Sequence, residues 1–305
     1  MLCRFIYYSF CSNLFFVAAE KPHLGLAVTV CAGATNMILD AVLVILLPKE
    51  YKLAGAAIAT ATSQTVGGVF PLFYFLRKNS SKLRLGKTRS EGRVIRKACL
   101  NGSSEFMSNV SMSIVGMLYN MQLMNYSGEN GVAAYGFMMY VSLIFAGAFI
   151  GYSIGTAPVI SYHSGAQNFD ELKSILKKSL ILIGSFAILM VVLSELSAIP
   201  FANIFVGYDA ELLDLTVCGF RIFSLSFLLM GYSIFGSGFF TALNDGLISA
   251  LISFLRTLVF QIASVLFLPL ILGIDGVWWS IVVAEFMSIV LTTLFLKLKQ
   301  KKYGY

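Results

Sequence analysis

Residues 179–206 read SLILIGSFAILMVVLSELSAIPFANIFV, and Glu195 is the one charged residue in this run. A helix that crosses the hydrocarbon core of a bilayer needs about 20 apolar residues. The run therefore indicates a transmembrane helix, and eight other stretches have the same character. These cover residues 2–19, 24–48, 53–76, 98–125, 131–158, 215–243, 247–272 and 274–298. The sequence predicts an all-α polytopic membrane protein with about nine transmembrane helices.

The composition of the whole chain agrees with a membrane location. Hydrophobic residues make up 58% of the 305 residues and charged residues 12%, whereas soluble domains carry about 25% charged residues. The net charge of +7 does not indicate nucleic-acid binding, because the basic residues gather in a few short loops and the tail. We expect a multi-pass protein of the cell membrane whose partners are the bilayer and small molecules.

The distribution of charge between the loops predicts the orientation. Basic residues dominate residues 77–97, 173–178 and 297–302, which share one side if nine helices alternate across the membrane. The opposite loops are acidic or neutral. By the positive-inside rule, the basic side and the C-terminus are expected to be cytoplasmic. Met1 would then lie outside, so we expect that the chain starts late within a larger fold.

An internal repeat predicts how the chain is divided. The first three segments match the last three in the order of their landmarks, and the alternative is a coincidence among apolar stretches. Repeats are characteristic of secondary transporters. The matching landmarks are residues 16–22 with 240–246, Pro48 with Pro269, and Gly55 with Gly276. We expect residues 1–76 as an incomplete N-terminal lobe, 77–97 as a basic cytoplasmic linker, 98–298 as a six-helix C-terminal lobe and 299–305 as a tail.

Asp40 is the strongest candidate for an ion site. It lies well inside segment 24–48, where a charged side chain costs about 2.5–3.5 kcal/mol on insertion scales. On a helix, Thr29, Gly33, Asn36 and Asp40 fall within a sector of about 60°. A carboxylate with an amide oxygen one turn away suits a proton or a small cation, so Asn36 and Asp40 are predicted to bind one. The alternative is a structural hydrogen bond between helices.

Segment 98–125 carries a second polar face. Glu105 lies on it as a candidate for cation or proton binding, and the alternative is pairing with a cation at headgroup level. A stripe this polar must face protein or a water-filled cavity, not lipid. We therefore expect Asn101, Ser108, Tyr119 and Gln122 to line a substrate cavity.

Other residues inside the helices are predicted to have structural roles. Arg256 and Glu285 lie in neighbouring segments and are predicted to form an ion pair. Arg221 and Glu195 lie nearer the helix ends, where they could extend their charges to the membrane surface. The G-x-x-x-G-x-x-x-G run at residues 147–155 is predicted to let two helices approach closely.

The residue patterns of metal or enzyme sites are absent from the sequence. The five cysteines are scattered, and His23 and His163, the two histidines, are far apart. No C-x-x-C or H-E-x-x-H motif occurs. We expect no metal, no cofactor and no catalytic residues, and hence a protein that is not an enzyme.

Three stretches of the sequence carry motifs in a definite order. The first is Asn36-Met-Ile-Leu-Asp40 with the glycine- and alanine-rich residues 53–59. The second is the run from Ala157 to Asn168, and the third combines residues 253–256, 268–269 and 275–278. Together they resemble the MATE family of multidrug and toxic-compound extrusion antiporters, although His163 stands where that family usually has asparagine. The similarity extends over essentially the whole chain.

The resemblance implies a fold of two six-helix lobes around a V-shaped central cavity. This chain would correspond to helices four to twelve, with the N-terminal lobe incomplete. The implied function is export of lipophilic, cationic drugs in exchange for H⁺ or Na⁺ by alternating access, by a protein expected to be monomeric. Asn36 and Asp40 match the fifth-helix pair of the proton site, and Glu105 falls in the helix that carries a cation-binding glutamate in another branch. The alternatives are a lipid-linked sugar flippase or polysaccharide exporter of the same superfamily, and an inactive fragment.

Overall fold

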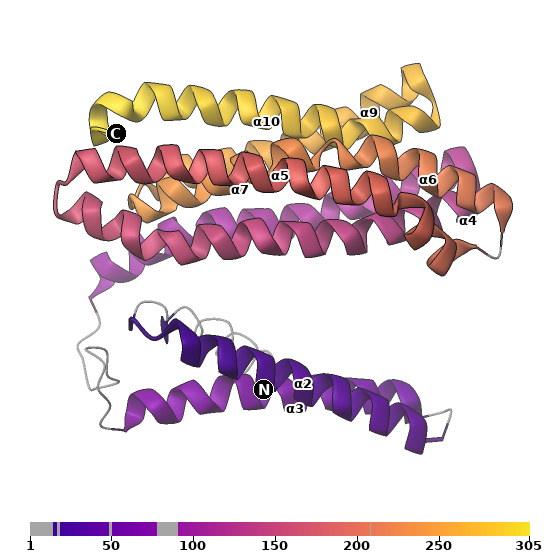
Figure 1. Ribbon diagram of the computed structural model, residues 1–305, viewed down its shortest axis with the longest axis horizontal. Helices are drawn as coiled ribbons and strands as arrows, with labels where there is room; N and C mark the ends of the chain where they lie inside the picture. Colours follow the sequence, from indigo (N-terminus) through magenta and orange to yellow (C-terminus); the bar gives the residue numbers. More distant parts are fainter. Residues whose placement is uncertain (1–14, 17–18, 49–50, 78–90, 208) are drawn as a thin grey trace. The chain divides into compact units, whose positions relative to one another are not determined.

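The structure is a computed structural model that describes residues 15–16, 19–48, 51–77, 91–207 and 209–305. The elements assigned within these residues are all helices (Figure 1), which confirms the predicted all-α fold. The chain forms two compact units, residues 1–90 and 91–305. The predicted segment 2–19 and the basic linker 77–97 lie largely outside the described residues. The division into lobes, linker and tail stays a prediction.

The helices follow the predicted segments closely. Their bounds are α2 Pro22–Leu46, α3 Lys52–Leu76, α4 Gly92–Gly165, α5 Phe169–Val206, α6 Ala210–Ser224, α7 Phe227–Ala242, α8 Gly246–Phe254, the π-helix η2 Leu255–Phe260, α9 Gln261–Leu272 and α10 Ile274–Tyr303. Helix α4 joins two predicted segments across a kink at Gly128, where φ is 60°. Among the described residues, five helices are long and apolar enough to cross a membrane, or six if the bent pair α6–α7 is one span.

In the first unit, α2 packs along α3. Gly55 allows the close approach, since a Cβ at this position would lie 2.8 Å from the Leu47 side chain. The corresponding glycine of the repeat, Gly276, approaches the backbone of Leu268 in the same way, at 2.5 Å. Gly55 with Leu47 and Gly276 with Leu268 are both eight residues apart, so the two halves of the repeat build this helix junction alike.

In the second unit, aromatic side chains fill the core. The largest fully buried ones include Trp278, Tyr119, Phe220, Phe227 and Phe235. The outer surface is also apolar, because large aliphatic side chains such as those of Ile204, Leu247, Leu270 and Ile271 are about three-quarters exposed or more. A surface of this kind requires lipid as its solvent, as the composition predicts.

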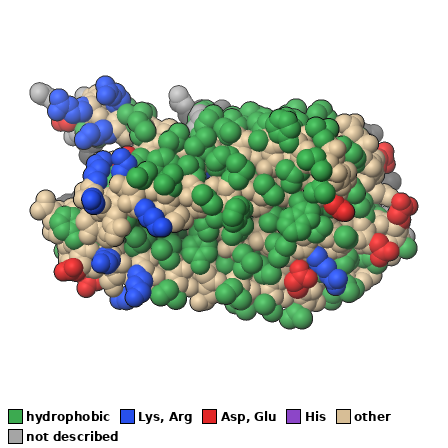
Figure 2. Space-filling model, turned by 90° about the horizontal axis from the view of Figure 1, so that it is seen from above, with side chains coloured by type: hydrophobic (Ala, Val, Ile, Leu, Met, Phe, Trp, Pro, Cys, Tyr) green, Lys and Arg blue, Asp and Glu red, His purple; other side chains and the backbone are tan. Residues whose placement is uncertain are grey.

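Most charged side chains of the second unit lie near the ends of the helices. In Figure 2, hydrophobic side chains cover the middle of the visible face and lysines and arginines gather at one end. The N-terminal part of α5 and the C-terminal part of α10 both contribute lysines. This separation places an apolar band between two polar ends.

Three helix-to-helix turns share one backbone design. Glu20, Gln167 and Asn244 each have a positive φ, of 60°, 55° and 61°. In each case the next residue donates its backbone N–H to a carbonyl five residues earlier: Lys21 to Phe16, Asn168 to His163 and Asp245 to Phe240, at 2.9–3.0 Å. The first and third turns occupy matching positions in the predicted repeat, and the second shows that the design also occurs outside the matched landmarks.

One packing prediction is wrong for the described residues. No neighbouring atom lies within 4 Å of the position that a Cβ would occupy at Gly147, Gly151 or Gly155. These glycines therefore leave an open strip on α4 instead of admitting a neighbouring helix of the same unit.

Candidate functional site

Asp40 lies in the C-terminal half of α2 and is half-buried. Its Oδ1 atom is buried and has no hydrogen-bond partner among the described residues. Thr29, on the same face, is satisfied locally by donating its hydroxyl to the Gly25 carbonyl at 2.9 Å. Gly33 has no neighbour within 4 Å of its Cβ position. The Asp40 carboxylate thus has an oxygen without a hydrogen bond from the described residues, on a helix face that is loosely packed. This is expected of an ion site, or of a site that another element completes.

The repeat relates Asp40 to a residue of the second unit. Asp40 stands eight residues before Pro48, and Gln261 stands eight residues before Pro269. Gln261 is buried and accepts a hydrogen bond from the Tyr119 hydroxyl at 3.0 Å. In the second half of the repeat, the polar side chain at this position is therefore hydrogen-bonded. In the first half, the Asp40 Oδ1 atom at the same position has no partner among the described residues.

The predicted residues on α4 differ in their surroundings. Tyr119 is 2% exposed, and Ser108 and Gln122 are half-buried. The side chains of Glu105 and Asn101 lie outside the described part of the structure. The predicted cation site at Glu105 therefore remains a prediction, and so does the cavity lining.

Tyr119 belongs to a buried polar cluster, which we define as Tyr119, Tyr135, Arg256, Gln261 and Glu285. The rings of Tyr119 and Tyr135 are stacked, with centroids 5.1 Å apart and an interplanar angle of 4°. Glu285 lies on α10 and Arg256 on η2, and both of these elements pack against α4. The cluster joins both parts of α4 to η2, α9 and α10.

The structure brings Arg256 and Glu285 together as an ion pair. Arg256 Nε donates to both carboxylate oxygens of Glu285 at 3.0 Å, and Nη2 donates to Oε1 at 2.7 Å. The two side chains are 15% and 3% exposed. Such a buried, multiply bonded pair removes most of the penalty that each charge alone would incur in the apolar interior.

The π-helix η2 explains part of this geometry. Arg256 lies within η2 and Gln261 directly follows it. The i→i+5 bonding of a π-turn widens the helix locally, and such turns are frequent at functional sites. Sequence reasoning missed Gln261 and Tyr135, although a glutamine inside segment 247–272 was a signal of an intramembrane partner.

Arg221 and Glu195 form a second polar contact, although each was predicted to extend its charge to the membrane surface. Arg221 and Glu195 approach to 3.7 Å, with side chains 53% and 40% exposed. Ser224 also donates a hydrogen bond to Glu195 at 2.8 Å. The two charges therefore pair between α6 and α5 instead of reaching separately for the membrane surface.

Metal ligation has no candidate in the described part of the chain. No group of three or more histidine, cysteine, aspartate or glutamate side chains is placed there to hold a metal ion. Cys31, Cys99 and Cys218 are free thiols.

Comparison with known proteins identifies relatives of the chain. A model of the MatE family matches residues 106–266, more than half of the chain. The multidrug export protein MepA of Staphylococcus haemolyticus is 26% identical over 282 residues, which cover 89% of this chain and 60% of that protein. MepA of Staphylococcus aureus strain bovine RF122 / ET3-1 is 24% identical over 288 residues, covering 92% of this chain and 61% of that protein.

Solved structures show the same fold. The crystal structure of MATE in complex with MaL6 has a TM-score of 0.89 and 20% identity, and the match covers 97% of this chain and 67% of that one. The outward-facing conformation of a multidrug resistance MATE family transporter of the MOP superfamily has a TM-score of 0.86 and 22% identity, with coverage of 96% and 66%. The chain spans about 60% of the length of these curated relatives.

Proposed function

Because this chain belongs to the MATE family, we propose that it acts in a transporter that exports lipophilic cationic compounds in exchange for protons or sodium ions. The family consists of transporters and not enzymes, which agrees with the curated relatives' designation as multidrug export proteins. The chain spans about 60% of their length, so the activity of a whole transporter is proposed for it and not carried over from them.

The observation that carries the proposal is the open carboxylate oxygen of Asp40. A carboxylate inside a membrane helix needs a partner, and a proton or a small cation can fill that role at the open oxygen. A residue of this kind can exchange a proton or a small cation for a cationic substrate. Asn36, one turn earlier on α2, supplies a neutral oxygen for the same ion.

Coupling then follows from competition between ligands. Binding of H⁺ or Na⁺ at Asp40, or at Glu105, neutralises the charge that holds a lipophilic cation. The two ligands favour opposite states of an alternating-access cycle, in which the two lobes rock about a central site. Each ligand shifts the population only as far as its affinities for the two states differ.

The charge distribution supports a direction for the protein in the membrane. The lysine-rich end of the second unit carries the start of α5 and the end of α10. We propose that this end and the C-terminus are cytoplasmic, because basic residues are retained on that side.

The flippase alternative is less well supported. A transporter of lipid-linked sugars needs basic side chains within the membrane that are available to bind a pyrophosphate. Arg256 is held by Glu285, and Arg221 pairs with Glu195. Each arginine therefore already has a carboxylate partner, which disfavours a polyanionic cargo.

An efflux assay tests the proposal. Cells that lack their own drug pumps would express the chain as given, or the chain extended by three N-terminal helices of a MATE relative, and be loaded with ethidium. We expect the extended form to export the dye, and either a proton uncoupler or removal of sodium to stop it. Absence of export by both forms, at normal membrane levels, would contradict drug export.

A further inference from the structure

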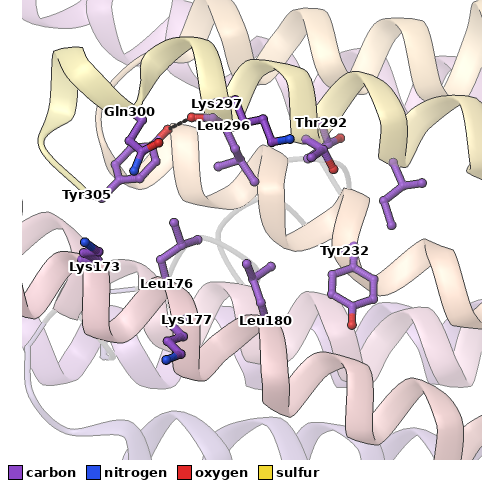
Figure 3. A pocket seen from close by; sticks show the side chains of 12 residues that line it. Lys173, Leu176, Lys177, Leu180, Tyr232, Thr292, Leu296, Lys297, Gln300 and Tyr305 are labelled. Carbon is purple, nitrogen blue, oxygen red and sulfur yellow. Dashed lines mark hydrogen bonds between the residues drawn. The ribbon is translucent and has the colours of Figure 1, made fainter.

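The second unit contains a pocket that the transport proposal does not use. It lies between α5, α7 and α10 and has a volume of about 470 Å³. Figure 3 shows Leu176 and Leu180 extending from α5 toward Leu296 of α10. Its remaining lining consists of three lysines, one isoleucine and polar or aromatic side chains: Lys173, Lys177, Lys297, Ile289, Tyr232, Thr292, Thr293, Gln300 and Tyr305.

The pocket extends along the helix axis rather than forming a round hole. Its lining on α10 runs from Ile289 to Gln300, which corresponds to about 16 Å at 1.5 Å per residue. One leaflet of the hydrocarbon core is about 15 Å thick. The pocket therefore has the length of a lipid chain within one leaflet.

Its basic end has charge without a counterion. Lys173, Lys177 and Lys297 form no ion pair with the described residues, whereas the nearby Lys302 is paired with Asp245 at 3.3 Å. Asp170 and Glu171 lie on the first turn of α5 but do not line the pocket. Three positive side chains thus line the pocket, so it favours an anion over a cationic drug.

A buried hydroxyl gives an independent indication of a ligand. Thr292 is 1% exposed and lines the pocket, and its Oγ1 has no hydrogen-bond partner among the described residues. A hydroxyl in a membrane helix ordinarily bonds to a carbonyl of its own helix, as Thr257 and Thr216 do here. The ester oxygens of a glycerolipid are acceptors of the right kind for this donor.

We propose that this pocket binds an anionic phospholipid of the surrounding bilayer. The phosphate lies among Lys173, Lys177 and Lys297, and one acyl chain runs between Leu176, Leu180 and Leu296. The apolar length distinguishes this ligand from a free phosphate, which would leave the leucine-lined part empty. Tyr305 closes the pocket near its basic end, because it is 5% exposed and donates its hydroxyl to the Leu296 carbonyl at 3.0 Å.

Native mass spectrometry of the purified full chain tests this. The chain would be reconstituted in equal amounts of phosphatidylglycerol and phosphatidylcholine and then released into detergent, and the retained lipid measured. We expect retained phosphatidylglycerol to exceed phosphatidylcholine, and the triple variant K173Q/K177Q/K297Q to lower its retention more than tenfold. Each lysine near an anionic surface contributes about fivefold, from about 1 kcal/mol.

The chain supplies a matched control in K178Q/K299Q/K301Q. These lysines come from the same two helix ends, and their replacement removes the same charge, but they do not line the pocket. Equal loss of phosphatidylglycerol in both triple variants would overturn the proposal, since charge alone would then explain retention. Equal retention of both lipids by the unmodified chain would overturn it too.

Two further measurements keep the proposal testable if a triple variant fails to fold. L180W fills the apolar part without changing charge, so we expect it to lower retention of phosphatidylglycerol. Glycerophosphoglycerol, the headgroup without acyl chains, should not displace the lipid. If L180W retains as much phosphatidylglycerol as the unmodified chain, or if the headgroup alone displaces all of the lipid, the lysines bind a free anion and the lipid site is refuted.

Discussion

The Arg256 guanidinium and the Glu285 carboxylate are joined by three hydrogen bonds of 2.7–3.0 Å, across 29 residues of sequence. The pair ties η2 to α10 at a depth where neither charge is stable alone. In the same unit, Tyr119 of α4 donates a hydrogen bond to Gln261 of α9 and its ring stacks on that of Tyr135. The second unit is thus organised around a buried polar centre, and its properties can be measured.

Breaking the ion pair from one side should destabilise the protein strongly. Glu285→Gln leaves a buried guanidinium without its counter-charge, a change that costs about 3–5 kcal/mol in comparable cases. We expect a clearly lower midpoint of thermal unfolding in detergent. The double variant R256M/E285M removes both charges and should recover most of the loss. A double variant as unstable as Glu285→Gln would contradict the proposed role of charge.

The buried hydrogen bond between Tyr119 and Gln261 should contribute more to the stability of the protein than a similar hydrogen bond near the surface. Tyr119→Phe leaves the Gln261 carbonyl oxygen buried and unpaired, at a cost of about 1–3 kcal/mol. Tyr126→Phe is the control, because the Tyr126 hydroxyl also donates a hydrogen bond, to the Pro269 carbonyl at 3.1 Å, but its side chain is 42% exposed. Thermal unfolding should separate the two variants, and equal effects would argue against a special role for the buried cluster.

The transport hypothesis predicts a specific effect at Asp40. Asp40→Asn keeps the shape of the side chain but removes its exchangeable proton, so dye export by the extended chain should fall at least tenfold at unchanged membrane levels. Thr35→Ala is a matched control on the same helix, because its exposed hydroxyl bonds only to the Cys31 carbonyl at 2.7 Å. Export retained by Asp40→Asn would remove Asp40 from the coupling mechanism.

Two glycines of the second unit should respond in opposite ways to alanine. At Gly231 a Cβ would lie 2.5 Å from Phe149 and 2.8 Å from Ile183, two side chains that are themselves buried. We expect Gly231→Ala to cost about 1–3 kcal/mol by overpacking. At Gly151 no neighbour lies within 4 Å, so Gly151→Ala should be neutral or stabilise the helix by about 0.5–1 kcal/mol. Unfolding midpoints in the reverse order would show that the packing described here is wrong.

The turn before α8 should make stability depend on pH. Burial raises the pKa of Asp245, but hydrogen bonds from Tyr303 and Lys302 outweigh it and hold the pKa below its ordinary value. A carboxylate with a lowered pKa contributes stability that is fully present above its unfolded-state pKa and is lost as the pH falls through the folded-state pKa. Unfolding midpoints measured from neutral to acidic pH should therefore decline less in Asp245→Asn than in the unmodified chain.

An acid at the same end provides the control for this experiment. Asp170 lies on the exposed first turn of α5 and is not part of the hydrogen-bonded group of Asp245, Lys302 and Tyr303. We expect Asp170→Asn to follow the pH dependence of the unmodified chain. If Asp170→Asn flattens the curve as much as Asp245→Asn does, the effect comes from net charge and not from the turn.

Several features could be predicted because they depend on local composition. The apolar run at 179–206 and its counterparts in the described residues predict about half of the helix bounds to within two residues. The helices extend five to ten residues further at the starts of α4, α5 and α6 and at the ends of α4 and α10. Residues 16–22 and 240–246 predict a shared turn, because the same backbone conformation needs similar residues at similar places. The Arg256–Glu285 pair could be inferred since each charge in an apolar helix requires a partner.

Other features depend on residues that are distant in the sequence. Tyr119 and Gln261 are 142 residues apart, and nothing local in either helix indicates that they meet. The π-turn at η2 and the pairing of Glu195 with Arg221 likewise arise only when α5, α6, α9 and α10 are packed. The glycine run at 147–155 misled for the same reason, because small residues permit close packing without supplying a neighbour.

The sequence by itself determined that this chain is a membrane protein, which residues form its helices and which loops carry its charges. The reason is that the free energy of transfer from water to lipid depends on the composition of each segment separately. The tertiary structure decided which polar groups satisfy one another and which remain open, among them Asp40 Oδ1 and Thr292 Oγ1. Hydrogen bonds and ion pairs act only over a few ångströms, so their partners are chosen when the helices pack and not before.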